Sequence, residues 1–189
     1  MARPFVEKLF PALPRRAIRA AMFKYLSFAL VAAFALSGAP AAAADTVYVV
    51  RHMQKAAGDD PALTAEGAAG AQWIADVLAA KGVTAVFATP TRRAEETAAP
   101  LAKRLGIDVT HYDPRNPAAL AAERASVKGA ALVVGHSNTV PDLVATFGGA
   151  RPAPMSEKDY GTIFVVNAGT SEVQEIILTP AVDPSRATN

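Results

Sequence analysis

The sequence contains no cysteine, and this absence excludes several kinds of protein and of site. Without thiols there is no disulfide framework, no thiolate metal site, no cysteine nucleophile and no lipidated cysteine. Histidine is also scarce, since only three occur in 189 residues. Chemistry that needs an imidazole is therefore confined to His52, His111 and His136.

Long hydrophobic runs are missing as well. The apolar stretch at residues 26–36 is about 11 residues long, whereas a membrane-spanning helix needs about 20. A short basic segment precedes this stretch and small residues follow it up to Asp45, which is the layout of a secretory signal peptide. We expect residues 1–44 to be that peptide, with Met22 as an alternative start and an uncleaved anchor as the alternative interpretation. Cleavage would leave a periplasmic or secreted bacterial protein with no stable membrane insertion.

Neither sign of charge is in large excess once this leader is set aside. Residues 1–44 hold 6 of the 19 Lys and Arg and 1 of the 17 Asp and Glu, which leaves 13 basic and 16 acidic residues. A mildly acidic domain has no global field that attracts nucleic acid. No nucleic-acid partner is expected, and any anion site must be local.

Strand-like and helix-like segments alternate from residue 45 to residue 180, which predicts one α/β domain followed by a tail at 181–189. We expect a three-layer sandwich, with helices on both faces of a mostly parallel, mixed sheet and a C-terminal antiparallel hairpin. The expected strands are 47–50, 83–88, 107–112, 131–134, 162–167 and 172–178, and the expected helices are 65–81, 91–105, 117–128 and 141–147.

Two of the three histidines directly follow buried strands in this pattern. His52 lies just after the run 47–50, and His136 lies just after the run 131–134. Ligands of open α/β sheets bind beyond the carboxyl ends of the strands, so both imidazoles are expected at one edge of the sheet.

Three kinds of chemistry use histidines in such a place. A metal pair would need a third ligand, and no His or Asp cluster accompanies either histidine. A Ser-His-Asp triad is disfavoured because Gly-x-Ser-x-Gly is absent and Ser137 is adjacent to His136 along the chain. Phosphoryl transfer to an imidazole remains, and it needs cationic donors around the phosphoryl oxygens. Arg51 precedes His52 directly, and Arg92 and Arg93 both lie in the first turn of a helix at the same edge of the sheet.

The motifs that contain these residues resemble those of the histidine phosphatase superfamily, the phosphoglycerate-mutase-like class. Together they extend over nearly all of residues 46–145. In chain order they are Arg51-His52, resembling the Arg-His-Gly signature; Leu63-Thr64-Ala65-Glu66-Gly67; Thr89-Pro90-Thr91-Arg92-Arg93-Ala94-Glu95-Glu96-Thr97, resembling Ser-Pro-x-x-Arg-Ala-x-x-Thr; and Val134-Gly135-His136-Ser137-Asn138.

This resemblance implies a role for each matching residue. His52 would attack phosphorus and carry a phosphohistidine, and His136 would be its catalytic partner. Arg51, Arg93 and His136 would bind the phosphoryl oxygens, and water would hydrolyse the intermediate with no metal and no cofactor. The family's proton donor has no obvious counterpart, and Asp113 is our candidate.

Two further departures from the family pattern directly follow His52. Met53 stands where a small residue is usual, and we expect it to crowd the mouth of the pocket. Gln54 stands where an acidic residue is frequent.

The resemblance predicts an exported phosphatase that hydrolyses a phosphomonoester or a phosphoprotein. The alternative is a catalytically weak module of the same fold that binds phosphorylated ligands in the periplasm. The partner is therefore a small phosphorylated substrate or a phosphoprotein, and the sequence carries no signal for an oligomeric state.

Overall fold

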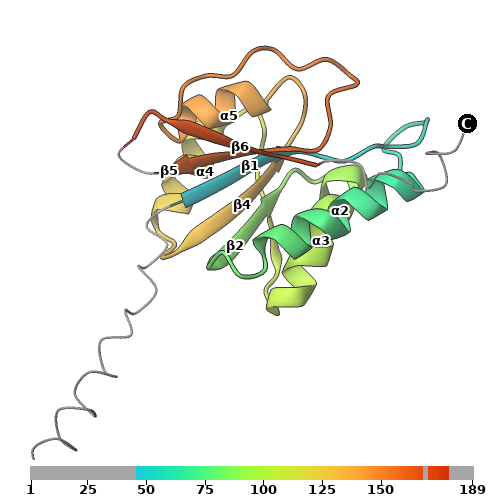
Figure 1. Cartoon of the computed structure of the whole chain (residues 1–189), viewed down its shortest axis with the longest axis horizontal. Helices are drawn as coiled ribbons and strands as arrows, with labels where there is room; N and C mark the ends of the chain where they lie inside the picture. Colours follow the sequence, from blue (N-terminus) through green and yellow to red (C-terminus); the bar gives the residue numbers. More distant parts are fainter. Residues whose placement is uncertain (1–45, 168–169, 179–189) are drawn as a thin grey trace, which may run out of the picture. The chain divides into compact units, whose positions relative to one another are not determined.

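A six-stranded mixed sheet organises the part of the chain that the computed structural model describes, residues 46–167 and 170–178 (Figure 1). The strand order is β3-β2-β4-β1-β5-β6. The pairs β1–β4, β2–β4 and β2–β3 are parallel, and β1–β5 and β5–β6 are antiparallel. The predicted leader at 1–44 and the predicted tail at 181–189 lie outside the described residues.

The order of elements along the chain is the predicted alternation of strands and helices, closed by a hairpin. The strands are β1 Thr46–Arg51, β2 Val83–Ala88, β3 Val109–His111, β4 Ala130–Gly135, β5 Thr162–Asn167 and β6 Val173–Ile177. The helices are α2 Ala65–Leu78, α3 Arg92–Leu105, α4 Pro117–Ala125 and α5 Val140–Thr146.

The sheet is covered on both faces, which confirms the three-layer prediction. Every residue of β1 and β4 is buried, as expected for parallel strands that carry helices on either side. Along β1, Tyr48 and Val50 belong to a core that contains apolar residues of α2 and α3. Val47 and Val49 belong to a second core, built with residues of α4 and α5.

Local chemistry explains where several helices begin and end. The Thr64 side chain accepts a hydrogen bond from the Gly67 N–H at 3.1 Å and caps α2. The Asn116 side chain caps α4 through the Ala119 N–H at 3.1 Å. Gly106 ends α3 in the left-handed conformation, with φ of 68°, which glycine adopts without strain.

The structure shortens some predicted elements. Helix α2 ends at Leu78, before the predicted end at Lys81, because residues 79–82 form a turn instead. Strand β3 lies at an edge of the sheet, where it pairs with β2 alone, and it comprises only residues 109–111 of the predicted 107–112. Both differences are at element ends, where apolar periodicity carries little information.

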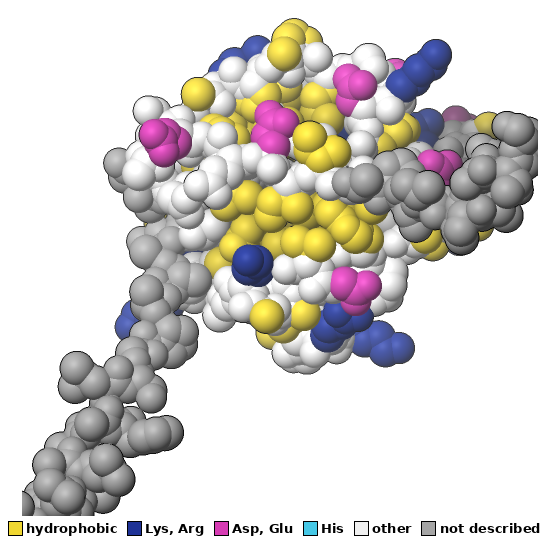
Figure 2. Space-filling model, viewed as in Figure 1, with side chains coloured by type: hydrophobic (Ala, Val, Ile, Leu, Met, Phe, Trp, Pro, Cys, Tyr) yellow, Lys and Arg dark blue, Asp and Glu magenta, His cyan; other side chains and the backbone are white. Residues whose placement is uncertain are grey.

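Surface features of the described residues are few. None of their helices has the length and apolar character needed to cross a bilayer. On the face seen in Figure 2, hydrophobic side chains gather in the middle of the view. Among the described residues, Ile177 on the edge strand β6 is the large hydrophobic residue with a highly exposed side chain, at 61%.

Candidate active site

The pairing of β1 with β4 brings two histidines together from positions 84 residues apart in the sequence. Arg51 lies opposite Gly135 in the register, and the His52 N–H donates to the Gly135 carbonyl at 2.9 Å. His136 follows Gly135 directly. As a result, the two imidazoles lie edge to face, with ring centroids 5.2 Å apart and planes at 64°.

A backbone contact determines the tautomer of His52. Its Nδ1 lies 2.8 Å from the Met53 carbonyl, which can only accept, so Nδ1 carries the hydrogen and Nε2 keeps a lone pair. Burial is the main cause that lowers the pKa of His52 to about 4, and the charges of His136, Arg51 and Arg93 lower it further. The imidazole is therefore neutral at neutral pH, which a nitrogen nucleophile requires.

The His136 ring is held by Thr89, which follows β2, and by Arg93, in the first turn of α3. Nη2 of Arg93 lies 3.4 Å from Nδ1 of His136, a long contact in which the imidazole nitrogen accepts. Nε2 of His136 then carries the hydrogen and donates to Oγ1 of Thr89 at 2.9 Å. Burial first, and then Arg93 and Arg51, lower the pKa of His136 to about 4. Thr89 was quoted in a motif without a role, and only the structure shows that it orients His136.

Arg51 is almost entirely buried, at 1% exposure, and the segment 156–160 holds its guanidinium. Nη1 donates to the carbonyls of Ser156 at 2.7 Å and Asp159 at 3.2 Å. Nη2 donates to Oε2 of Glu157 at 3.0 Å and to the Tyr160 hydroxyl at 3.2 Å, and the guanidinium lies 4.1 Å above the Tyr160 ring. The remaining N–H, at Nε, is buried and has no hydrogen-bond partner among the described residues.

Arg93 is the second arginine of the candidate site. Its Nη1 lies 3.6 Å from Oδ1 of Asp60, and its side chain is 21% exposed. Nε of Arg93 is again buried without a hydrogen-bond partner among the described residues. Its neighbour Arg92 points outward and pairs with Glu96 at 2.8 Å.

Arg51 and Arg93, whose charges lower the pKa of both histidines, thus each have a buried N–H donor that lacks an acceptor among the described residues. Buried polar groups are nearly always hydrogen-bonded, and those left without partners mark a place for a water, an ion or a ligand. Guanidinium N–H groups match the oxygens of an oxyanion. The arrangement of Arg51, Arg93, His52 and His136 is therefore suited to an oxyanion.

Met53 does not crowd the mouth of the pocket, contrary to the prediction. Its side chain is fully buried in the core between the sheet and α2. Its terminal methyl group is so close to Gly70 that a β-carbon there would lie 2.1 Å from it. The Met53 N–H donates to the hydroxyl of the buried Thr97 at 3.0 Å. Thr97 in turn donates to the Arg93 carbonyl at 2.7 Å, so it links the segment after β1 to the start of α3.

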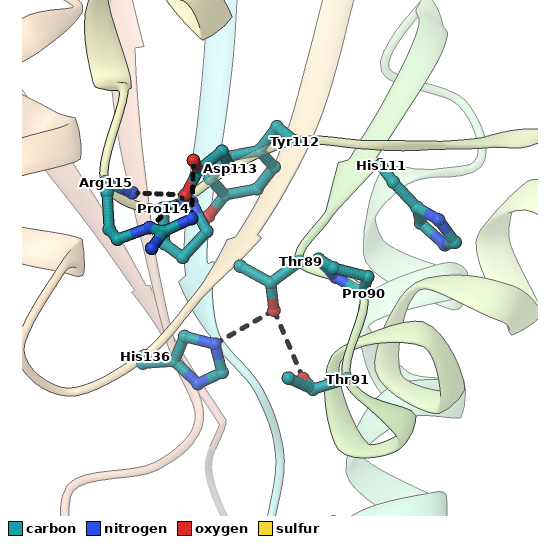
Figure 3. A pocket seen from close by; sticks show the side chains of 9 residues that line it. All are labelled: Thr89, Pro90, Thr91, His111, Tyr112, Asp113, Pro114, Arg115 and His136. Atoms are coloured by element: carbon teal, nitrogen blue, oxygen red, sulfur yellow. Dashed lines mark hydrogen bonds and ion pairs between the residues drawn. The ribbon is translucent and has the colours of Figure 1, made fainter.

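Asp113 lies beside the site and is paired with a neighbour in the sequence. Its Oδ1 accepts from the Arg115 backbone N–H at 2.9 Å and from Nε of Arg115 at 3.0 Å. These bonds lower the pKa of Asp113. The carboxylate lines a cavity of about 550 Å³ that reaches His136 and whose other walls come from Thr89, Pro90, Thr91, His111, Tyr112, Pro114 and Arg115 (Figure 3). Figure 3 shows the Asp113–Arg115 pair on the side of this cavity opposite His111.

Sequence reasoning missed the contribution of Glu157 and Tyr160. They lie in the segment between α5 and β5, which has no helical or strand period and no motif. Oε1 of Glu157 accepts from Oγ of Ser137 at 2.7 Å, so this carboxylate joins the segment to the residue after His136. The ring of Tyr160 lies 6.1 Å from that of His52. No local pattern predicts that the segment folds back over Arg51.

The comparisons with known proteins agree with this fold. Residues 47–115 match the family model of the histidine phosphatase superfamily, branch 1. No curated protein matches the sequence. Among solved structures, the protein histidine phosphatase SixA in complex with tungstate is 22% identical, with a TM-score of 0.55 over 69% of this chain and 94% of SixA.

Two further structures have the same fold at lower identity. A mycobacterial glucosyl-3-phosphoglycerate phosphatase is 13% identical, with a TM-score of 0.55 over 72% of this chain and 99% of that chain. A putative alpha-ribazole-5'-P phosphatase from Escherichia coli is 15% identical, with a TM-score of 0.55 over 71% and 96%. The described domain is therefore phosphoglycerate-mutase-like. Its resemblance to the histidine phosphatase superfamily is confirmed by the matched segment and by the fold.

Proposed function

We propose that this protein is an exported phosphatase that hydrolyses a phosphomonoester or a phosphoprotein through a phosphohistidine on His52. One observation carries the proposal. Two neutral imidazoles 5.2 Å apart lie near Arg51 and Arg93, whose charges lower the pKa of both rings and whose buried Nε–H groups have no hydrogen-bond partner among the described residues. A phosphoryl group supplies the oxygens that these donors lack, and it is also the electrophile that a neutral imidazole attacks.

In the first step, Nε2 of His52 attacks phosphorus and the bond to the leaving oxygen breaks. The Met53 carbonyl holds the Nδ1 hydrogen, so the lone pair of Nε2 is the one available. Charge develops on the phosphoryl oxygens in the transition state, and the guanidinium groups of Arg51 and Arg93 stabilise it. In the second step, water displaces His52 from phosphorus and releases inorganic phosphate.

The relatives support oxyanion binding by this fold. The SixA structure holds tungstate, and structures of the mycobacterial phosphatase are complexes with inorganic phosphate and with VO3. SixA is a protein histidine phosphatase, and the mycobacterial enzyme is a glucosyl-3-phosphoglycerate phosphatase. Both substrate classes stay within the proposal. The exported location rests on the leader-like composition of residues 1–44 alone.

The second candidate is a module that binds phosphorylated ligands with little turnover. The hydrogen bonds of Arg51 favour this candidate, because four of its five N–H groups already donate to the segment 156–160. It is also favoured by Asp113, the predicted proton donor, whose carboxylate is held by Arg115.

Turnover of an activated aryl phosphate by the purified protein distinguishes the two candidates. The phosphatase proposal expects turnover, acid-labile phosphate trapped on the wild type, and loss of both in His52→Ala. Thermal stabilisation by tungstate reports the anion site separately. Tungstate stabilisation without turnover or trapped phosphate would favour the binding module and reject the phosphatase.

A further inference from the structure

Glu157 is a carboxylate positioned between the two halves of the candidate site. Its Oε2 accepts from Nη2 of Arg51 at 3.0 Å, and its Oε1 accepts from Oγ of Ser137 at 2.7 Å. Arg51 precedes one histidine and Ser137 follows the other. The side chain of Glu157 is nevertheless 75% exposed, so water reaches it freely.

Hydrolysis of a phosphohistidine needs a group that neither imidazole supplies. His52 is bound to phosphorus at that stage, and the Nδ1 of His136 already accepts from Arg93. The attacking water must lose a proton as its oxygen bonds to phosphorus. A carboxylate within reach of that water is the usual acceptor.

The other two carboxylates near the site are less suited to this task. Asp113 is held by the backbone and the guanidinium of Arg115. Asp60 accepts from the Arg92 backbone N–H at 2.9 Å and lies against Arg93. The charge of Glu157 raises the pKa of His136, and neither Asp60 nor Asp113 is among the groups that shift the pKa of His52 or His136.

Glu157 is also in the right state to accept a proton. The hydrogen bond from Ser137, the charge and hydrogen bond of Arg51, and the charge of Lys55 lower its pKa. It is therefore ionised at neutral pH. An ionised carboxylate accepts a proton from water but has none to give to a leaving group, which assigns it to the second half of the reaction.

We infer that Glu157 is the general base of the hydrolysis step; this inference rests on the proposed phosphohistidine reaction. The water oxygen forms a bond to phosphorus as its proton passes to the Glu157 carboxylate. The bond between phosphorus and Nε2 of His52 breaks, and its electron pair returns to Nε2. The products are inorganic phosphate, neutral His52 and protonated Glu157, which then releases the proton to solvent. Ser137 positions the carboxylate through its hydroxyl.

Glu157→Gln tests this assignment, because glutamine preserves the shape and can still accept from Arg51. An aryl phosphate with a leaving group of low pKa needs no proton donor in the first step. We expect a burst of aryl product close to that of the wild type, a steady-state kcat lower by about 10²-fold, and a larger acid-labile phosphate fraction at steady state. Tungstate affinity should change by less than about threefold, since the unpartnered Nε–H donors are untouched.

Two comparison variants make the outcome specific. Glu123→Gln makes the same change at an exposed position of α4 and should match the wild type in every measurement. Asp113→Asn should not enlarge the trapped phosphate fraction. The inference is overturned if Glu157→Gln has the wild-type kcat and trapped fraction, if its kcat/KM rises, or if Asp113→Asn accumulates the phosphoenzyme instead. A wild type that traps no phosphate rejects the phosphohistidine proposal itself, which is a different result.

Discussion

The imidazoles of His52 and His136 lie edge to face, with centroids 5.2 Å apart, and both are neutral because burial lowers their pKa values to about 4. The Met53 carbonyl holds one nitrogen of His52, whereas Thr89 and Arg93 hold the two nitrogens of His136. Two cationic imidazoles at this distance would repel each other and the two arginines. This relationship leads to the first prediction.

Stability should fall as the pH is lowered from about 6.5 to about 4. The pKa of each histidine is lower in the folded state than the ordinary value of 6.5, so the unfolded chain binds more protons in this window. The expected loss is on the order of 1 kcal/mol per pH unit for each histidine. Urea unfolding of the wild type between pH 7 and pH 5 should show this slope.

The double variant His52→Asn and His136→Asn is the control, because its neutral side chains do not titrate. Its slope should be clearly smaller in the same window. The carboxylates whose pKa values are lowered, Asp76, Glu96, Asp113 and Glu157, lose their contribution only at lower pH. Equal slopes in the two proteins would contradict the prediction.

The two arginines should differ in their effect on stability. Arg51→Met removes a buried guanidinium that holds the segment 156–160, so we expect a loss of about 3 kcal/mol in the free energy of unfolding. Arg93→Met removes a partly exposed side chain with longer contacts and should cost less than about 1 kcal/mol. Both should weaken tungstate binding by at least tenfold. Chemical unfolding together with tungstate titration measures both effects, and similar stability losses would contradict the contrast.

Thr97→Val should reduce stability although it barely changes the shape of the side chain. The valine cannot accept from the Met53 N–H, which is buried and has its hydrogen bond at 3.0 Å to this hydroxyl. Leaving that donor without a partner costs about 1–3 kcal/mol. Thr97→Ser keeps the hydroxyl and should recover most of the loss. If valine and serine variants unfold at the same denaturant concentration, the hydrogen bond is not the cause.

Gly70→Ala should destabilise the protein through Met53. A β-carbon at position 70 would meet the Met53 methyl group, so this methionine must move within a packed core at a cost of about 1–3 kcal/mol. Part of that cost is offset by about 1 kcal/mol, because alanine forms a helix interior better than glycine does. The Met53→Ala change removes the obstructing atoms, so the two substitutions should be coupled favourably in a double-mutant cycle. Additive losses would show that the cost of the alanine does not come from Met53.

Much of the fold could be predicted because its signals are local. The apolar runs of β1 and β4 are those of strands buried on both faces, and Thr64, Gly106 and Asn116 mark helix ends by their own backbone chemistry. The position of His52 and of His136 just beyond strands also follows from the sequence. Parallel strands then direct both to one edge of the sheet.

Met53 shows where local reasoning fails. Its place beside His52 suggested a side chain in the pocket. However, the chain turns after β1, and Thr97 holds the Met53 backbone so that the side chain enters the core against α2. The direction of a side chain just outside a strand depends on contacts with another helix, which no periodicity records.

By itself, the sequence determined the alternation of strands and helices, the starts of α2 and α4 and the two strand-end histidines, because each depends on neighbouring residues. Only the tertiary structure decided which strands pair, how closely His52 approaches His136, and that Glu157 reaches Arg51 from 106 positions away. The register of β1 with β4 and the return of the segment 156–160 over the site are long-range contacts. They are selected by the packing of the whole domain, so no short stretch of sequence contains them.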